Sequence, residues 1–351
     1  MKKRIAYLDV ARGIGMILVV MGHVDFISEP LRDYITSFHM PLFLIVSGIL
    51  LYVTKTEERS FGQVAKRKCC TILLPYFVFS GGAILFELVR ALVKDLDMTG
   101  ELLRRCFQTL CLQGFSTFWF LPTLFIGELI FLKVRQKWNL KWTAGIGIGL
   151  TILMYFVAIG EKSFYQSHAG VLGYELLHDV LLVPIRGAFS GGYIFLGYFL
   201  GILLEKRPSV LWRDGPAGIF LLIVTAIINQ FASFVDLRFL QFGNPILFFL
   251  RTICGAIGVI MLCRGLEAYL NGFVGNVLRF FGKNSLIIMT THLDYRILNY
   301  CIKAAALING FVRNQVLYAV LTVLFVFLVE AVVIYIINRF FYKILGRKTQ
   351  K

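Results

Sequence analysis

An apolar stretch near the beginning of the chain, residues 8–24, carries three ionisable side chains, those of Asp9, Arg12 and His23. His23 follows Arg12 by 11 positions. Along an α-helix this spacing returns to within about 20° of the same face and advances by about 16 Å. Asp9 precedes Arg12 by three positions, which permits an ion pair on that face. The sequence therefore predicts one polar stripe on an otherwise apolar helix.

Such a stripe has two interpretations. Ionisable groups at membrane depth usually face the protein interior and mark a functional site or a structural pair. In the functional interpretation a long ligand lies along the stripe, Arg12 holds its anionic or carbonyl group, and His23 acts as a base or a nucleophile. In the structural interpretation Asp9 and Arg12 pair with each other, and His23 is a polar residue at the membrane surface.

Two other side chains belong to the outer face of the predicted membrane region. His39 opens the stretch "SFHMPLFLIVSG" after a short turn. We therefore expect it to share a vestibule with His23, although a role as a water-facing helix cap explains it equally well. Trp119, in "STFWFLPTLFIGEL", lies at an outer boundary, where an aromatic belt would also place a tryptophan.

The late stretch "FFGKNSLIIMTTH" carries polar residues at both ends. His292 lies towards its predicted outer end. Its cytoplasmic end holds three polar residues, Lys283, Asn284 and Ser285. Their side chains suit helix capping and also suit an incoming phosphate at a helix N-terminus. Capping is the simpler of the two interpretations.

The elements that must position these residues are apolar helices. The chain has 351 residues, of which 58% are hydrophobic and 16% charged, unlike a soluble domain. Crossing a hydrocarbon core of about 30 Å takes roughly 20 apolar residues. We predict an all-α polytopic transmembrane bundle forming a single domain, residues 1–351, with crossings at residues 5–27, 36–53, 71–93, 118–134, 142–160, 181–204, 215–234, 245–264, 274–293 and 315–342.

The basic residues orient this bundle of ten predicted helices. The net charge of +16 is spread over the loops, which argues against nucleic acid as a partner. With the N-terminus inside, 23 of the 36 lysines and arginines fall in cytoplasmic segments and nine in outer loops, so both termini are predicted to be cytoplasmic. The seven cysteines have neither disulfide nor zinc spacing, and we predict no metal site. The absence of phosphate-loop and HExxH motifs removes support for ATP-driven pumping and zinc proteolysis.

Several stretches together resemble the integral-membrane acyltransferase-3 family. The resemblance is carried by "YLDVARGIGMILVVMGHV", "FHMPLFLIVSGILL", "FWFLPTLFIGEL", "GYIFLGYFLG" and "FGKNSLIIMTTH", and covers most of the chain. Its most specific element is the arginine and histidine with ten residues between them, which match Arg12 and His23. Details of "FHMPLF" and "LLPYFVF" are similar to the subgroup of fucose 4-O-acetylase-like proteins.

The resemblance implies an O-acyltransferase of a bacterial inner or plasma membrane. It would move an acetyl or other short acyl group from cytoplasmic acyl-CoA to a hydroxyl of an extracytoplasmic glycan or cell-envelope sugar, without a bound cofactor. The implied partners are acyl-CoA, a carbohydrate acceptor and the lipid bilayer, and homo-oligomerisation is left open. The implied roles are catalysis by His23, Arg12 and Asp9, acyl-CoA binding by Lys66, Arg67, Lys68, Lys283, Asn284 and Ser285, and substrate binding by His39, Trp119 and His292.

One departure from the family pattern concerns the acyl-CoA residues. The family often has an Arg-x-x-Arg pattern just before the proline that opens the third helix, whereas here Lys66, Arg67 and Lys68 lie seven to nine residues before Pro75. An ordinary positive-inside loop explains this cluster equally well.

Two other classes of protein remain as alternatives. A permease or exporter of an anionic or amphipathic solute would use Arg12 as a counter-charge and His23 as a proton relay, and it predicts coupling to an ion gradient. A non-catalytic membrane sensor would need an effector domain, which the sequence does not reveal.

Overall fold

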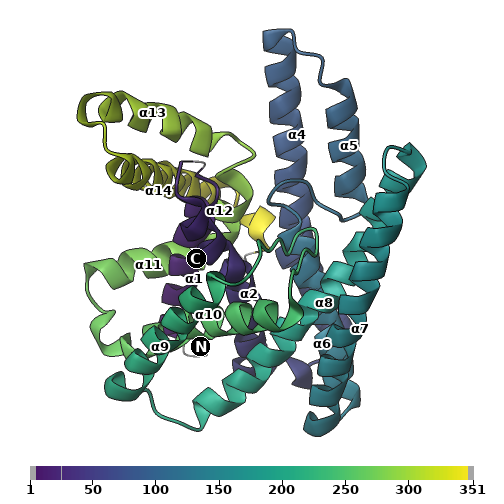
Figure 1. Cartoon of the computed structure of the whole chain (residues 1–351), viewed down its shortest axis with the longest axis vertical. Helices are drawn as coiled ribbons and strands as arrows, with labels where there is room; N and C mark the ends of the chain where they lie inside the picture. Colours follow the sequence, from purple (N-terminus) through teal and green to yellow (C-terminus); the bar gives the residue numbers. More distant parts are fainter. Residues whose placement is uncertain (1–4, 25, 347–351) are drawn as a thin grey trace. The chain divides into compact units, whose positions relative to one another are not determined.

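A computed structural model of the chain describes residues 5–24 and 26–346, which are predominantly helical and contain no β-strand (Figure 1). This confirms the predicted all-α polytopic bundle. Contacts divide the chain into two compact units. The first unit comprises Met1–Leu50 and Gly197–Tyr335, and the second comprises Leu51–Leu196 and Ile336–Lys351. We describe each unit separately.

The first unit holds the polar stripe. Its helices are α1 (Ala6–Gly22), most of α2 (Glu29–Val53), the end of α8 (Leu172–Glu205), α9 (Leu211–Asn229), α10 (Pro245–Gly265), α11 (Phe273–Lys283), α12 (Ser285–Thr291), α13 (Ile297–Val312) and most of α14 (Gln315–Phe340). Helix α9 packs along α10, and α1 packs along α11.

Two glycines allow α1 and α11 to approach closely. A Cβ atom built on Gly13 would overlap the carbonyl oxygen of Leu278, and one on Gly282 would overlap the carbonyl oxygen of Asp9. Backbone therefore meets backbone at this crossing, which is the kind of contact that small residues allow between membrane helices. The crossing brings the end of α11 beside Asp9, at the polar stripe of α1.

The second unit contains the basic cluster and the tryptophan motif. Its helices are α3 (Phe61–Lys68), α4 (Leu74–Lys94), α5 (Thr99–Leu110), α6 (Phe120–Lys137), α7 (Leu140–Ser167) and most of α8. A π-helical turn over Cys69–Leu73 joins α3 to α4, so one continuous helix runs over Phe61–Lys94. Pro75 lies in the first turn of α4, directly after the π-helical turn.

Seven helices of the described chain are long and apolar enough to cross a membrane. They are Glu29–Val53, Phe61–Lys94, Leu140–Ser167, Leu172–Glu205, Leu211–Asn229, Pro245–Gly265 and Gln315–Phe340, each overlapping a predicted span. Two of the remaining predicted spans correspond to shorter or more charged helices, because α1 has 17 residues and α6 has 18 with four charged side chains.

The predicted span 274–293 is wrong as one continuous helix. The backbone leaves the helical region at Asn284, with φ −110° and ψ 16°, and α11 ends there before the shorter α12 begins. Three consecutive polar residues, Lys283, Asn284 and Ser285, lie at the break, between apolar segments that together are long enough to be predicted as one span.

Helices α5 and α13 were also not predicted. Helix α5 is amphipathic, so its mean hydropathy is low although its exposed face carries Leu103 and Leu110. The Asp97 carboxylate accepts a hydrogen bond from the backbone N–H of Thr99 at 3.1 Å, which helps to start α5 and lowers the pKa of Asp97 below its ordinary value.

Candidate functional site

Helix α1 carries its polar stripe as the sequence predicts. Asp9 and Arg12 lie one turn apart, with 3.9 Å between Asp9 Oδ1 and Arg12 Nη1. Arg12 also reaches out of α1, because its Nη2 donates a hydrogen bond to Ser285 Oγ at 2.7 Å. His23 is the exposed residue at which α1 ends. The stripe thus has an arginine that holds the beginning of α12 and a histidine at the other end of α1.

His23 lies beside a second imidazole, that of His292. The centroids of the two rings are 5.4 Å apart, and their planes meet at 42°. His292 follows α12, is completely buried, and its Nδ1 lies 2.6 Å from the carbonyl oxygen of Ile288. Because a carbonyl can only accept, Nδ1 carries a proton. In the neutral ring, Nε2 then keeps its lone pair, and it has no hydrogen-bond partner among the described residues.

The short helix α12 connects the residue that Arg12 contacts with the histidine that lies beside His23. It begins at Ser285, which Arg12 contacts, and ends at Thr291, immediately before His292. Thr291 Oγ1 lies 2.8 Å and 2.9 Å from the two carboxyl oxygens of Glu330 on α14. The two residues are 39 positions apart in the sequence, so only the tertiary structure brings them together.

The residues around the break between α11 and α12 take different roles. The side-chain amide of Asn284 donates to the carbonyl oxygen of Phe280 at 2.9 Å, so Asn284 caps the end of α11. No side-chain hydrogen bond caps the beginning of α12. Ser285 accepts from Arg12, and Lys283 is the last residue of α11. The capping prediction therefore fits Asn284, at the helix end opposite to the one expected.

His39 lies within α2, to which it is hydrogen-bonded. Its Nδ1 is 3.0 Å from the carbonyl oxygen of Ile35, one turn earlier in the same helix, and its side chain is half-buried. Helix α2 starts at Glu29, seven residues before the predicted span 36–53. His39 is consequently an internal residue of α2 and not a helix cap, which makes that alternative wrong.

In the second unit, the basic cluster lies on the last turn of α3. Lys66 and Arg67 are exposed. Lys68 points to α6 instead, where its Nζ lies 2.7 Å from a carboxyl oxygen of the buried Glu128. Two of the three predicted acyl-CoA residues are thus exposed, and the third forms an ion pair between two helices.

Trp119 packs against a buried arginine of the same unit. Its side chain is 8% exposed, and the guanidinium carbon of Arg186 lies 5.2 Å from the centre of its ring. Arg186 Nε donates to Thr123 Oγ1, and its Nη2 donates to the carbonyl oxygen of Gln113, both at 2.8 Å. This cation–π contact and burial account for Trp119 better than a place in a lipid-facing aromatic belt does.

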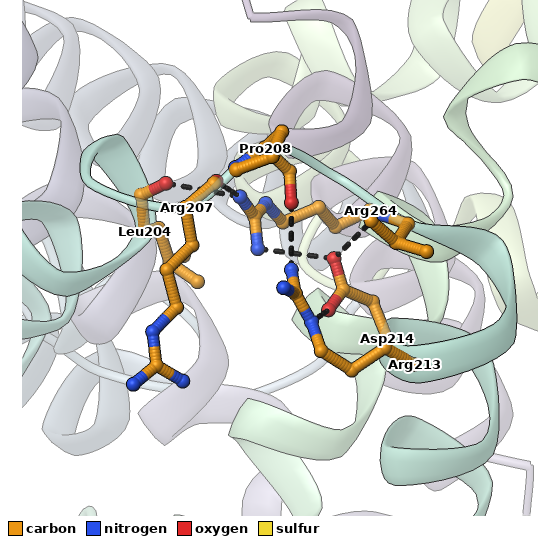
Figure 2. A network of polar contacts seen from close by, with 7 residues as sticks. Leu204, Arg207, Pro208, Arg213, Asp214 and Arg264 are labelled. Atoms are coloured by element: carbon orange, nitrogen blue, oxygen red, sulfur yellow. Dashed lines mark hydrogen bonds and ion pairs between the residues drawn. The ribbon is translucent and has the colours of Figure 1, made fainter.

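The first unit contains one more polar network, which the sequence did not reveal (Figure 2). Asp214 lies 3.0 Å from Arg264 Nη1 and 2.7 Å from Arg213 Nε, and it is completely buried. The network continues to backbone carbonyls, since Arg264 donates to Leu204 and Arg207 and Arg213 donates to Pro208. All these acceptors belong to the chain itself, so we assign the network to holding the connection between α8 and α9 against the end of α10.

Metal-ligating residues do not cluster in residues 5–24 and 26–346: no group of three or more His, Cys, Asp or Glu side chains lies close enough to hold an ion. The seven cysteines, all within this part of the chain, are free thiols.

The fold and this geometry define a class: a multi-pass membrane protein with two adjacent histidines at one end of an arginine-bearing helix. Comparison with known families is more specific. The acyltransferase-3 family model, described as an acyltransferase domain, matches residues 5–335, so the chain belongs to the acyltransferase-3 family. The chain is accordingly a membrane acyltransferase. Neither the curated proteins nor the solved structures that were compared gave a match.

Proposed function

We propose that this membrane acyltransferase moves an acetyl or other short acyl group from cytoplasmic acyl-CoA to a hydroxyl of an extracytoplasmic glycan or cell-envelope sugar. The observation that carries the proposal is that the ring centroids of His23 and His292 lie 5.4 Å apart. His23 stands at the end of α1, the helix that also bears Arg12. The charge bias of the loops supports cytoplasmic termini, and the family resemblance implies a bacterial inner or plasma membrane. The sugar acceptor follows the resemblance to fucose 4-O-acetylase-like proteins.

The length of the stripe suits acyl-CoA. This donor has phosphates at one end and a reactive thioester at the other, joined by a long pantetheine arm. Arg12 and His23 are about 16 Å apart along the axis of α1. Arg12 has five N–H donors, and its contacts with Asp9 and Ser285 fix its orientation. In the proposal Arg12 orients the arm or the thioester carbonyl, while the thioester carbon lies beside the two imidazoles.

Two chemical routes are available to the imidazoles. As a base, His23 takes the proton of the acceptor hydroxyl while the oxygen attacks the thioester carbonyl, and the carbon–sulfur bond breaks to release CoA. As a nucleophile, His23 first takes the acyl group from sulfur and then passes it to the hydroxyl oxygen. His292 Nε2 has a lone pair that can accept a hydrogen bond from another hydroxyl of the acceptor sugar, while the attacking hydroxyl gives its proton to His23. His292 therefore fits the role of binding the acceptor.

Binding of the CoA phosphates is assigned to exposed basic residues. Lys66 and Arg67 are exposed at the end of α3, whereas Lys68 is already paired with Glu128. Lys283, exposed at the end of α11, suits a second phosphate contact in the first unit, whereas the predicted ligands Asn284 and Ser285 are buried and hydrogen-bonded to Phe280 and Arg12. His39 and Trp119 are kept as acceptor-binding candidates, with Trp119 acting from its contact with Arg186.

Label transfer tests this function. Membrane vesicles containing the chain are given radiolabelled acetyl-CoA on the cytoplasmic side, and methyl α-L-fucoside and the envelope glycan of the host serve as acceptor probes. Label is expected in glycan, and both His23→Ala and Arg12→Ala are expected to abolish its transfer while the proteins still insert and purify. The control is His168→Ala, at the half-buried residue that follows α7 in the second unit.

Retained transfer in His23→Ala would contradict the mechanism. A permease would instead move a solute in response to an ion gradient without consuming acetyl-CoA. Solute transport without acylation would therefore overturn the proposed activity, whereas labelled glycan overturns the permease.

A further inference from the structure

Glu330 is a buried carboxyl group in the middle of a long apolar helix. Its side chain is fully buried within α14, the most apolar candidate membrane span of the described chain. Ionisable groups at such a depth are costly and are usually kept for a function or for a specific partner. The described partner of Glu330 is a hydroxyl, that of Thr291.

The hydroxyl of Thr291 forms the contact with Glu330. Thr291 Oγ1 lies 2.8 Å and 2.9 Å from the carboxyl oxygens of Glu330 and 2.7 Å from the carbonyl oxygen of Ile287. The Thr291 hydroxyl can donate its proton to the carboxyl group of Glu330. The carbonyl of Ile287 lies four residues earlier in α12 and already accepts the helical hydrogen bond from the backbone of Thr291, so it does not require that proton. The hydroxyl therefore links α12 to α14.

The contact holds the end of a helix that is too short to be stable alone. Helix α12 has seven residues, and isolated helices of this length do not persist in water because nucleation is unfavourable. Arg12 holds its first residue, Ser285, and Glu330 holds its last, Thr291. The next residue is His292, whose ring lies beside His23. Two ionisable groups from different helices therefore fix both ends of the segment that places this imidazole.

We propose that Glu330 is a positioning residue for His292, acting through the hydroxyl of Thr291. The inference rests on the proposed function only in taking His292 to bind the acceptor. Without the hydrogen bond to Glu330, the end of α12 loses its tie to α14, and His292 Nε2 moves relative to His23. A displacement of about 1 Å at a reacting group can lower a rate by about 100-fold.

Four variants test the proposal by acetyl transfer. Glu330→Leu is expected to lower kcat by about 10- to 100-fold with little change in the KM for acetyl-CoA. Glu330→Gln is expected to restore most of the rate, because its amide oxygen can accept from Thr291 Oγ1 as the carboxyl does, and to keep the pH profile of the wild type. Thr291→Val is expected to match Glu330→Leu, and Thr291→Ser to restore the rate.

Thr290 provides a matched control one residue earlier. Thr290 is equally buried, but its described hydrogen bonds go to Leu286 and Ile287 of its own helix. Thr290→Val removes the same hydroxyl without touching the link to α14, and its rate is expected to stay within about three-fold of the wild type. If Thr290→Val loses as much activity as Thr291→Val, the proposal fails.

A readout that does not depend on activity separates this inference from the proposed function. Hydrogen exchange of residues 285–292 in nanodiscs is expected to be faster in Glu330→Leu and unchanged in Glu330→Gln. If the wild type transfers no acyl group, the proposed function fails, and exchange still decides whether Glu330 holds α12. The inference is overturned if exchange in Glu330→Leu is unchanged, or if Glu330→Gln is as inactive as Glu330→Leu.

Discussion

Replacing Gly282 with alanine should separate α1 from α11 and weaken the site through the backbone alone. A Cβ atom at Gly282 would lie 2.8 Å from the carbonyl carbon of Asp9 and overlap its oxygen. Carbon atoms in contact prefer separations of about 3.5 to 4.0 Å. The end of α11 must therefore move away from α1 by roughly 1 Å.

This movement is large enough to remove a hydrogen bond of the site. The distance between Arg12 Nη2 and Ser285 Oγ is 2.7 Å, and a further 1 Å takes it beyond about 3.6 Å, where no hydrogen bond remains. Hydrogen bonds to charged groups contribute about 1.5–3 kcal/mol, and overpacking costs about 1–3 kcal/mol. We expect Gly282→Ala to lower the free energy of unfolding by a few kcal/mol, which destabilises the protein. The acetyl-transfer rate should fall by about 10- to 100-fold.

The assay compares heat unfolding and acetyl transfer in the same nanodisc preparation. Gly310→Ala is the matched control, because Gly310 lies in α13 of the same unit with open space where its Cβ would stand. Alanine should stabilise that helix by up to about 1 kcal/mol. If Gly282→Ala unfolds at the wild-type temperature and transfers acetyl groups at the wild-type rate, the close backbone crossing does not support the site, and our reasoning is refuted.

Two further predictions concern the second unit. Glu128→Leu should destabilise the protein by about 3–5 kcal/mol, because it leaves the charge of Lys68 without this partner. Adding Lys68→Leu should recover most of the loss, and heat unfolding that shows no recovery would contradict the buried ion pair. Lys66→Ala with Arg67→Ala should raise the KM for acetyl-CoA several-fold, more strongly at low salt. An equal effect of Lys206→Ala, an exposed cation of the first unit, would indicate general charge attraction instead.

Local ion pairs within a helix were predictable from sequence, since they depend only on helix geometry. Asp9 with Arg12 and Glu87 with Arg90 are both three residues apart, and both pairs form, the second at 2.6 Å. The stripe on α1 follows from the same periodicity. Its function as an acyl-transfer site remains a prediction.

Pairs that depend on the tertiary structure were not predictable. Ser285 contacts Arg12 across 273 positions of the chain. His292 and His23 were expected at the same face of the membrane, but only the packing of α12 brings their rings together. The break at Asn284 lies within the polar residues Lys283, Asn284 and Ser285, but the average hydropathy of the apolar segments around them still predicts one span. Hydropathy reports how well a segment dissolves in lipid, and it does not report where a helix bends.

The π-helical turn over Cys69–Leu73 has a consequence for how related sequences should be aligned. A π-type hydrogen bond spans five residues instead of four, so the turn takes up one extra residue without ending the helix. One step along an α-helix corresponds to about 100° of rotation. Deleting one residue within 69–73 should therefore restore a regular α-helix and keep Lys66 and Arg67 on the same face relative to Pro75, whereas a deletion within regular α-helix would turn them by about a quarter of a circle. An alignment gap inside this segment, rather than before it, would keep equivalent basic side chains on the same face.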